Sequence, residues 1–244
     1  MSFLTGTLVA WLGQSCFVIT TLAGAHLLID PVNPAVGYPV KAHSVDASVI
    51  FVSHNHFDHN WTDMAVNADN VVEPKTDPGY QDVRLSYTAA GKKQTVIAKR
   101  IFSYHDQNGG KDRGTNTITV IDVDGLRICH LGDLGQRELT PKQVSLIGNV
   151  DVLMIPVGGF YTIDAKQAVA VTEQLHPKVI FPMHFQTSYL NPDLKAKLHP
   201  VSEYLDAMRG KATVVSGDAD RYPLAHDRLP SKPVIVLLKW TERP

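Results

Sequence analysis

Three histidines and one aspartate fall within six consecutive positions of the segment Ser53-His54-Asn55-His56-Phe57-Asp58-His59. The apolar, β-branched run ASVIFVS (47–53) leads into this segment and predicts a strand that is buried on both faces. If the chain stays extended, side chains alternate in direction, so His54 and His56 point to the same side. Asp58 and His59 can then reach a neighbouring point. Imidazole and carboxylate groups are ligands that Zn²⁺, Mn²⁺ and Fe²⁺ accept, so the segment predicts a metal site.

The simpler interpretation of such a segment is a solvated polar loop. A lone histidine usually has that role, or is a hydrogen-bonded core residue. Several histidines at one point repel one another when they are protonated, so the cluster costs free energy unless a metal ion compensates. We therefore favour the metal site.

The rest of the chain predicts a mixed α/β architecture that would position these groups. Strands are expected at 7–13, 15–21, 25–31, 47–53, 95–105, 151–159, 176–185 and 233–240, and a hairpin at 115–133 turns at Asp124-Gly125. Helices are expected at about 61–68, at 141–147 behind a Thr140 cap, and at 164–175. No repeat or long linker interrupts the pattern, so we expect a single domain over residues 1–244, with helices covering sheets.

Three later segments carry further residues of the ligand type: Tyr104-His105-Asp106, His130-Leu131-Gly132-Asp133 and Pro182-Met183-His184-Phe185. The H-x-H-x-D-H element at 54–59, preceded by Asp30-Pro31 at the end of an upstream strand and followed by these three segments, resembles the metallo-β-lactamase superfamily. The run Gly158-Gly159-Phe160-Tyr161-Thr162 and the Pro-Met-His segment resemble its branch of ascorbate-6-phosphate lactonase-like and N-acylphosphatidylethanolamine phospholipase D-like hydrolases. The resemblance runs from about Thr7 to Thr187.

This resemblance implies an α/β fold, the four-layer αββα sandwich, with two divalent metal ions at the sheet edge. Zinc is the expected metal, and manganese or iron would suit the same ligand types. A hydroxide shared by two such ions can attack a carbonyl or phosphorus centre near neutral pH. The implied first-site ligands are His54, His56 and His105; the implied second-site ligands are Asp58, His59 and His184; Asp133 would bridge, and Asp58 would also be the catalytic residue beside the hydroxide.

His130 is the alternative to His105 as the third histidine ligand. Strand positions that differ by three point to opposite faces, so His130 and Asp133 would converge only through a turn at Gly132. His105 ends its own strand, and we therefore favour it, with His130 buried beside the site. The five other histidines are expected to be structural or exposed: His26, His43, His176, His199 and His226.

Candidate substrate-binding residues are fewer and less specific. Arg113, with Lys111, follows His105 in a glycine-bearing loop and could meet an anionic substrate, although a solvated charge is the simpler interpretation. Gly159 could allow close backbone approach near the site, or could merely form a turn. Tyr161 follows in the same run. Loops at 31–46, 72–86, 107–116 and 186–200 are expected to shape the pocket.

Composition limits the classes of protein that fit. The chain has 244 residues, and 23 Lys and Arg against 24 Asp and Glu give a net charge of −1, which argues against bulk capture of nucleic acid or an anionic membrane. Two cysteines, Cys16 and Cys129, cannot form a disulfide framework and indicate a reduced protein. No apolar stretch reaches the ~18–20 residues that span a bilayer. We expect a cytoplasmic protein, with a homo-oligomer allowed.

The function that the sequence favours is a metal-dependent hydrolase of a small ester, lactone or phosphodiester. A metal-dependent nuclease is the second hypothesis, disfavoured by the neutral charge and by the lack of a basic stripe. A non-catalytic metal-binding regulatory module is the third, and a complete ligand set argues against it. An oxygen-reducing diiron enzyme is disfavoured because that branch generally has an acidic residue where His56 stands.

Overall fold

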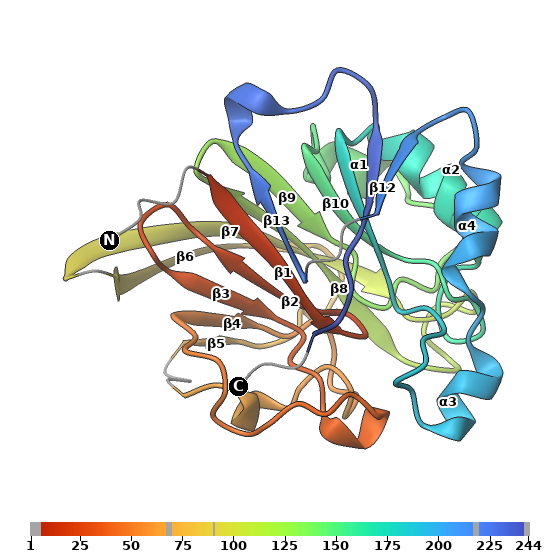
Figure 1. Cartoon of the computed structure of the whole chain (residues 1–244), viewed down its shortest axis with the longest axis horizontal. Helices are drawn as coiled ribbons and strands as arrows, with labels where there is room; N and C mark the ends of the chain where they lie inside the picture. Colours follow the sequence, from red (N-terminus) through yellow and green to blue (C-terminus); the bar gives the residue numbers. More distant parts are fainter. Residues whose placement is uncertain (1–5, 67–69, 90, 217–219, 242–244) are drawn as a thin grey trace.

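The computed structural model describes residues 6–66, 70–89, 91–216 and 220–241. Two β-sheets pack face to face, and α-helices lie along the outer face of one of them (Figure 1). This mixed α/β architecture with two sheets confirms the predicted fold class. In the described residues all four α-helices follow residue 140, and only short 3-10 turns precede it.

The first sheet has six strands in the order β13-β1-β2-β3-β4-β5. Its strands are antiparallel from β13 to β3, and β3, β4 and β5 are parallel. The strand bounds are β1 (Thr7–Gly13), β2 (Cys16–Thr20), β3 (His26–Ile29), β4 (Val49–Phe51), β5 (Val71–Val72) and β13 (Arg221–Leu224).

The second sheet has eight strands in the order β12-β14-β11-β10-β9-β8-β7-β6. It is parallel from β12 to β9 and antiparallel from β9 to β6. The strand bounds are β6 (Tyr80–Ala89), β7 (Lys92–Tyr104), β8 (Thr115–Val123), β9 (Leu126–His130), β10 (Val152–Pro156), β11 (Val179–Met183), β12 (Thr213–Ser216) and β14 (Val234–Leu237).

Strand β10 shows how the layers are held together. Val152 and Met154 point into the core between the two sheets, whereas Leu153 and Ile155 point into the core under the helices. Successive side chains of a strand face opposite ways, so a continuous apolar run serves both cores. Neither Cys16 nor Cys129 forms a disulfide, and both are buried among apolar side chains, as expected.

The helices begin where their capping residues predict. Thr140 and Gln143 form a capping box at α1 (Pro141–Ile147), and Asp164 and Gln167 form one at α2 (Ala165–Leu175). Two further helices were not expected from the sequence: α3 (Pro192–Lys197) and α4 (Val201–Ala207). No helix in the described part of the chain has the length and apolar character needed to cross a membrane.

The expected helix at 61–68 is wrong over its described part. Only a 3-10 turn forms, at Thr62–Met64, and residues 67–69 lie outside the described residues. Ala65 is extended and pairs with Val45, and the Met64 carbonyl accepts hydrogen bonds from the Ser44 and Val45 N–H groups. Tertiary pairing therefore uses backbone groups that a continuing helix would need.

The region expected as a loop at 72–86 is partly the edge strand β6. Its side chains alternate between exposed and buried, with Val83, Tyr87 and Ala89 packed into the inter-sheet core. Apolar and polar residues alternate over 82–89, a period-two pattern typical of a half-buried strand, which the sequence interpretation missed.

Candidate metal centre

The chemistry-bearing segments follow strands that end at one edge of the sandwich. β9 and β11 are both parallel to β10, and β7 and β9 are each antiparallel to β8, so β7, β9 and β11 all end on the same side. His105, Asp133 and His184 therefore follow neighbouring strand ends. The 54–59 segment follows β4 of the facing sheet.

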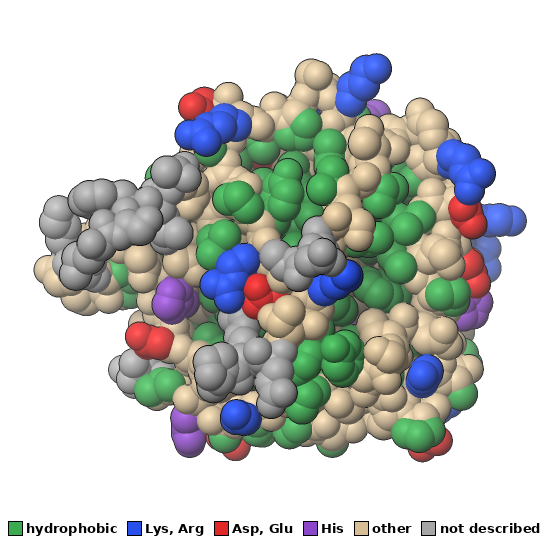
Figure 2. Space-filling model, viewed as in Figure 1, with side chains coloured by type: hydrophobic (Ala, Val, Ile, Leu, Met, Phe, Trp, Pro, Cys, Tyr) green, Lys and Arg blue, Asp and Glu red, His purple; other side chains and the backbone are tan. Residues whose placement is uncertain are grey.

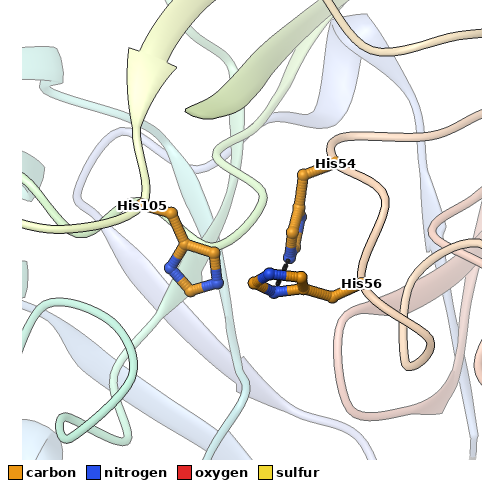
Figure 3. Close-up of side chains that lie close together, drawn as sticks. All are labelled: His54, His56 and His105. Carbon is orange, nitrogen blue, oxygen red and sulfur yellow. Dashed lines mark hydrogen bonds between the residues drawn. The ribbon is translucent and has the colours of Figure 1, made fainter. Parts of the chain in front are cut away.

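The first group of potential metal ligands consists of His54, His56 and His105, whose rings converge from two loops (Figure 3). His54 Nε2 lies 3.1 Å from His56 Nδ1. His54 and His105 are buried, whereas His56 is exposed to the cavity described below. Burial, with the neighbouring His59, holds the pKa of His54 well below its usual value, so this imidazole is neutral and can offer a lone pair.

The second group consists of Asp58, His59, Asp133 and His184, which offer ligand atoms within 4.8 Å of one another. His59 Nε2 lies 3.4 Å from Asp58 Oδ2 and 3.2 Å from Asp133 Oδ2. Three of the four side chains are buried, and Asp58 borders the cavity.

Asp133 lies between the two groups. Its Oδ2 atom is 3.2 Å from Nε2 of His59 and of His184, 3.3 Å from Nε2 of His105 and 3.9 Å from Nε2 of His54. Burial raises the pKa of Asp133, but the surrounding histidines outweigh it and lower the pKa well below its usual value. One carboxylate thus faces four imidazoles that belong to both groups.

Asp30 orients histidines of both groups from behind, a role that the sequence interpretation did not assign. This fully buried carboxylate accepts hydrogen bonds from Ser53 N (2.7 Å), Ser53 Oγ (2.6 Å) and His59 Nδ1 (2.9 Å). Ser53 Oγ also lies 2.9 Å from His54 Nδ1. With both Nδ1 atoms occupied, His54 and His59 present Nε2 to the centre, as second-sphere partners of metal ligands do.

His130 does not belong to either group, although the turn at Gly132 (φ 56°) does form. Its Nε2 lies 2.9 Å from the Ser15 carbonyl, and its Nδ1 accepts from Gly132 N at 3.0 Å. Both ring nitrogens are therefore engaged in hydrogen bonds to the backbone. The five remaining histidines also lie outside both groups, and all but His26 are exposed.

The donor set fits a divalent cation. His59 Nδ1 is hydrogen-bonded to Asp30. Its Nε2 atom is buried and has no hydrogen-bond partner among the described residues, although it faces two carboxylates. Ligands of a tetrahedral zinc ion at about 2.0–2.2 Å lie roughly 3.3–3.6 Å from one another. The separations of 3.2 to 3.4 Å in the second group are close to that spacing.

Three further residues support the centre and were missed by the sequence interpretation. Gln14 Nε2 lies 3.4 Å from Asp58 Oδ2, and Ser15 Oγ lies 3.4 Å from Asp133 Oδ1. Asn116 accepts from Asp133 N at 2.9 Å and donates to the Leu131 carbonyl at 2.9 Å. These contacts join segments distant in sequence, so no local pattern could have indicated them.

A cavity of about 400 Å³ opens on the centre. Arg113 and Tyr161 line the cavity, together with parts of the predicted loops at 107–116 and 186–200. Gly159 does not line the cavity; it forms the turn before Tyr161. Gly158 makes the close approach instead, because a Cβ there would lie 2.1 Å from the His184 carbonyl oxygen. The lining comprises Asn55, His56, Phe57, Asp58, His105, Asp112, Arg113, Asp133, Tyr161, His184 and Leu194.

Asp106 fixes the loop that carries Arg113. Its Oδ1 accepts from Asn108 N (2.7 Å) and Gly110 N (2.9 Å), and its Oδ2 accepts from Asp112 N (3.0 Å) and Arg113 N (2.8 Å). Burial raises the pKa of Asp106, but these four N–H groups outweigh it and lower the pKa. The loop is therefore ordered around a carboxylate.

We expect Asp106→Asn to loosen this loop, because an amide has one acceptor oxygen and must abandon one of the two N–H pairs. Hydrogen bonds to charged groups contribute about 1.5–3 kcal/mol each, so amide exchange at 108–113 should accelerate at least about tenfold. Hydrogen-exchange mass spectrometry measures this, with Asp63→Asn, an exposed aspartate of the remote 3-10 turn at Thr62–Met64, as the matched control. Equal protection in wild type and Asp106→Asn would contradict the assignment.

Comparisons with known proteins identify the family of this chain. Residues 8–184 match the family model described as a beta-lactamase superfamily domain. A UPF0173 metal-dependent hydrolase of Anaeromyxobacter dehalogenans is 30% identical over 233 residues, covering 85% of this chain and 83% of that protein. A second, from Thermococcus onnurineus, is 28% identical and covers 73% of this chain and 84% of that protein.

Solved structures give the same result. A protein of Thermotoga maritima, described as a Zn-dependent hydrolase of the metallo-β-lactamase superfamily, has a TM-score of 0.67 and 32% identity. The match covers 95% of this chain and 98% of that one. Igni18, a metallo hydrolase from Ignicoccus hospitalis, shares the fold at a TM-score of 0.57 and 19% identity, covering 83% of this chain and 92% of that one.

These matches confirm the superfamily that the motifs indicated, while the narrower branch of lactonase-like and phospholipase-like enzymes stays a prediction. The family model spans most of the chain, and it includes every residue of both candidate ligand groups. The chain belongs to the beta-lactamase superfamily and is a metal-dependent hydrolase of its metallo-β-lactamase class.

Proposed function

We propose that this chain, as one domain over residues 1–244, binds two divalent metal ions and hydrolyses a small ester, lactone or phosphodiester. The single observation that carries the proposal is the place of Asp133, whose Oδ2 faces four imidazoles of both ligand groups. In this proposal His54, His56 and His105 hold the first ion; Asp58, His59 and His184 hold the second; Asp133 contacts both.

Divalent ions bound there would supply a hydroxide nucleophile near neutral pH and would offset negative charge that develops on the substrate. The chain's own residues arrange the site around that chemistry. Asp30 and Ser53 keep the Nε2 atoms of His54 and His59 directed at the centre. Asp58 lies where the centre meets the cavity, with Gln14 Nε2 at 3.4 Å from Oδ2, and this placement supports its role as the residue that orients the attacking water.

A small-molecule substrate suits the cavity, because pockets for such ligands typically enclose about 300–1,000 Å³. On the face drawn in Figure 2, the Lys and Arg side chains of the described residues lie in small groups, several of them beside acidic side chains, and form no continuous stripe. This distribution and the net charge of −1 favour a small ester, lactone or phosphodiester over nucleic acid. Zinc is the proposed ion, since histidine and carboxylate at these separations suit it.

The test of this function is turnover before and after chelation. Protein stripped with a chelator is assayed with para-nitrophenyl esters, a γ-lactone and bis-para-nitrophenyl phosphate, and then reloaded with Zn²⁺, Mn²⁺ or Fe²⁺. We expect hydrolysis of at least one class to disappear on stripping and to return with metal. Turnover that survives complete removal of metal would contradict the proposal.

Metal binding should release a proton at neutral pH. Burial lowers the pKa of His59, but the carboxylates of Asp133, Asp58 and Asp30 outweigh it and raise the pKa well above 6.5. Metal-free protein therefore carries a proton on His59 at pH 7, and a metal ion must displace it. His54 and His56, whose pKa values are lowered chiefly by burial, release none.

The sign of the pH dependence follows from that raised pKa. As pH falls, protons compete more strongly for His59, so affinity at the second site should fall about tenfold per pH unit. Calorimetric titration with Zn²⁺ in buffers of different ionisation enthalpy counts the protons released. Binding with no proton release at pH 7 would contradict the assignment of His59.

A further inference from the structure

Two cationic side chains share one pair of aromatic rings beside the cavity, and of these four residues Arg113 and Tyr161 line it. The Arg113 guanidinium carbon lies 5.5 Å from the centre of the Tyr161 ring and 5.8 Å from that of Phe160. Lys197 Nζ lies 5.7 Å and 5.6 Å from the same two rings. Arg113 and Tyr161 line the cavity, and so does Leu194 of α3, the helix that ends at Lys197.

Neither cation has a direct ion-pair partner within the described part of the chain. The ion pairs found there, defined by N–O distances of up to 4.0 Å, include neither Arg113 nor Lys197. Asp112 also lines the cavity; its carboxylate accepts a hydrogen bond from Asn108 and makes no ion pair with Arg113 or Lys197. The ring faces attract each cation, yet two like charges beside the same rings repel one another, and an anion at the cavity mouth would relieve that repulsion.

Phe160 supplies an independent observation. Its backbone is left-handed, with φ at 48°, a conformation that is costly for a bulky residue and that glycine or asparagine adopts more readily. Its side chain is 54% exposed, so full burial of the ring does not offset this strain. Strain beside a candidate site is grounds for a functional hypothesis, and here the function is to hold the two cations.

Apolar side chains line the same cavity as Arg113. Phe57 is 53% exposed and lines the cavity together with Leu194. Exposed aromatic side chains at a cavity mouth are typical of ligand contact. A ligand here would meet positive charge on one side and apolar carbon on the other.

We propose that Arg113 and Lys197, held on the rings of Phe160 and Tyr161, bind an oxyanion of the substrate, either a carboxylate or a phosphate, remote from the bond that is cleaved. The apolar part of the substrate lies on Phe57. The substrate is thus an anionic, amphipathic ester, lactone or phosphodiester. For the cleavage step this inference rests on the proposed function, but anion binding itself does not.

Three matched para-nitrophenyl esters test the proposal on metal-loaded enzyme: the neutral pentanoate, the glutarate monoester with a terminal carboxylate, and the phosphonobutanoate with a terminal phosphonate. The variants are Arg113→Gln, Lys197→Gln and both together. Each single change should lower the ratio of kcat/KM for an anionic ester to that for the neutral ester about tenfold, the loss typical of one charged hydrogen bond. The ester that shows the larger fall identifies the preferred anion.

Two control variants sharpen the result. Lys142→Gln removes an exposed lysine of α1 that lies outside the cavity, and should leave the ratio at its wild-type value. Phe160→Asn suits the left-handed backbone, so it should keep or raise the melting temperature while it lowers the ratio. An unchanged ratio in the Arg113 and Lys197 variants would overturn the proposal.

Binding separates a failure of this proposal from a failure of the hydrolase proposal. Wild type and the double variant are titrated calorimetrically with butylphosphonate and with glutarate. If no ester is hydrolysed but at least one anion binds wild type at least tenfold more tightly than the double variant, the anion site stands and the proposed hydrolysis fails. Equal binding by both proteins, or binding by neither, overturns the anion site.

Discussion

Replacing Asp133 with asparagine should weaken the binding of both proposed metal ions at once. Oδ2 of Asp133 lies within 3.9 Å of four imidazole nitrogens that belong to both groups. A neutral amide would remove the negative charge that, in the proposed centre, offsets two divalent cations. Each lost ion forfeits several kcal/mol of transition-state stabilisation, so kcat/KM should fall at least about a hundredfold.

Asp58→Asn is the matched variant, because it converts a carboxylate into the same amide but belongs only to the second ligand group. The second ion should weaken, while an ion held by His54, His56 and His105 persists and supports residual turnover. Metal content by mass spectrometry and the melting temperature are measured for both variants, since unfolding would also release metal. Equal loss of both ions in the two variants, with folding intact, would contradict the bridging role of Asp133.

The second large effect distinguishes His105 from His130. His105→Ala should remove one ion and most of the activity. The Nδ1 atom of His105 has no hydrogen-bond partner in the described residues. Truncating the ring therefore breaks no hydrogen bond at that atom. His130→Ala should behave in the opposite way, because it leaves the Ser15 carbonyl and the Gly132 N–H unpaired and buried.

An unsatisfied buried polar group costs about 1–3 kcal/mol, so His130→Ala should lower the free energy of unfolding by at least that amount. It should keep both ions, with metal affinity changed by no more than about 10–100-fold, as for residues behind a ligand. Chemical denaturation and metal analysis of the two variants give the comparison. Loss of an ion in His130→Ala but not in His105→Ala would reverse the assignment.

The strands next to the site could be predicted because their signals are local. The run before His54 is short, apolar and β-branched, and it forms β4 as expected, although only Val49–Phe51 are in the ladder. The hairpin turn at Asp124-Gly125 also forms, with φ of 51° and 79°, because these residues tolerate the left-handed conformation that the turn needs. Capping residues located the starts of α1 and α2 for the same reason.

The parts that could not be predicted depend on distant residues. Asp30 lies more than twenty positions from Ser53 and His59, and only the pairing of β3 with β4 brings them together. The expected helix at 61–68 gives way to a bridge with Val45 for a similar reason. Lys197 lies over the rings of Phe160 and Tyr161 because of the position of α3, which forms within the segment predicted as a loop at 186–200.

The proposed centre, with Asp133 between two metal ions, is tested most directly by anomalous diffraction at the metal absorption edge from crystals of the purified protein. We expect two anomalous peaks, one surrounded by His54, His56 and His105 and the other by Asp58, His59 and His184, with the Asp133 carboxylate between them. An anomalous peak coordinated by His130 would contradict this arrangement. So would a map with no metal peak together with a refined structure in which His54, His56 and Asp58 point apart.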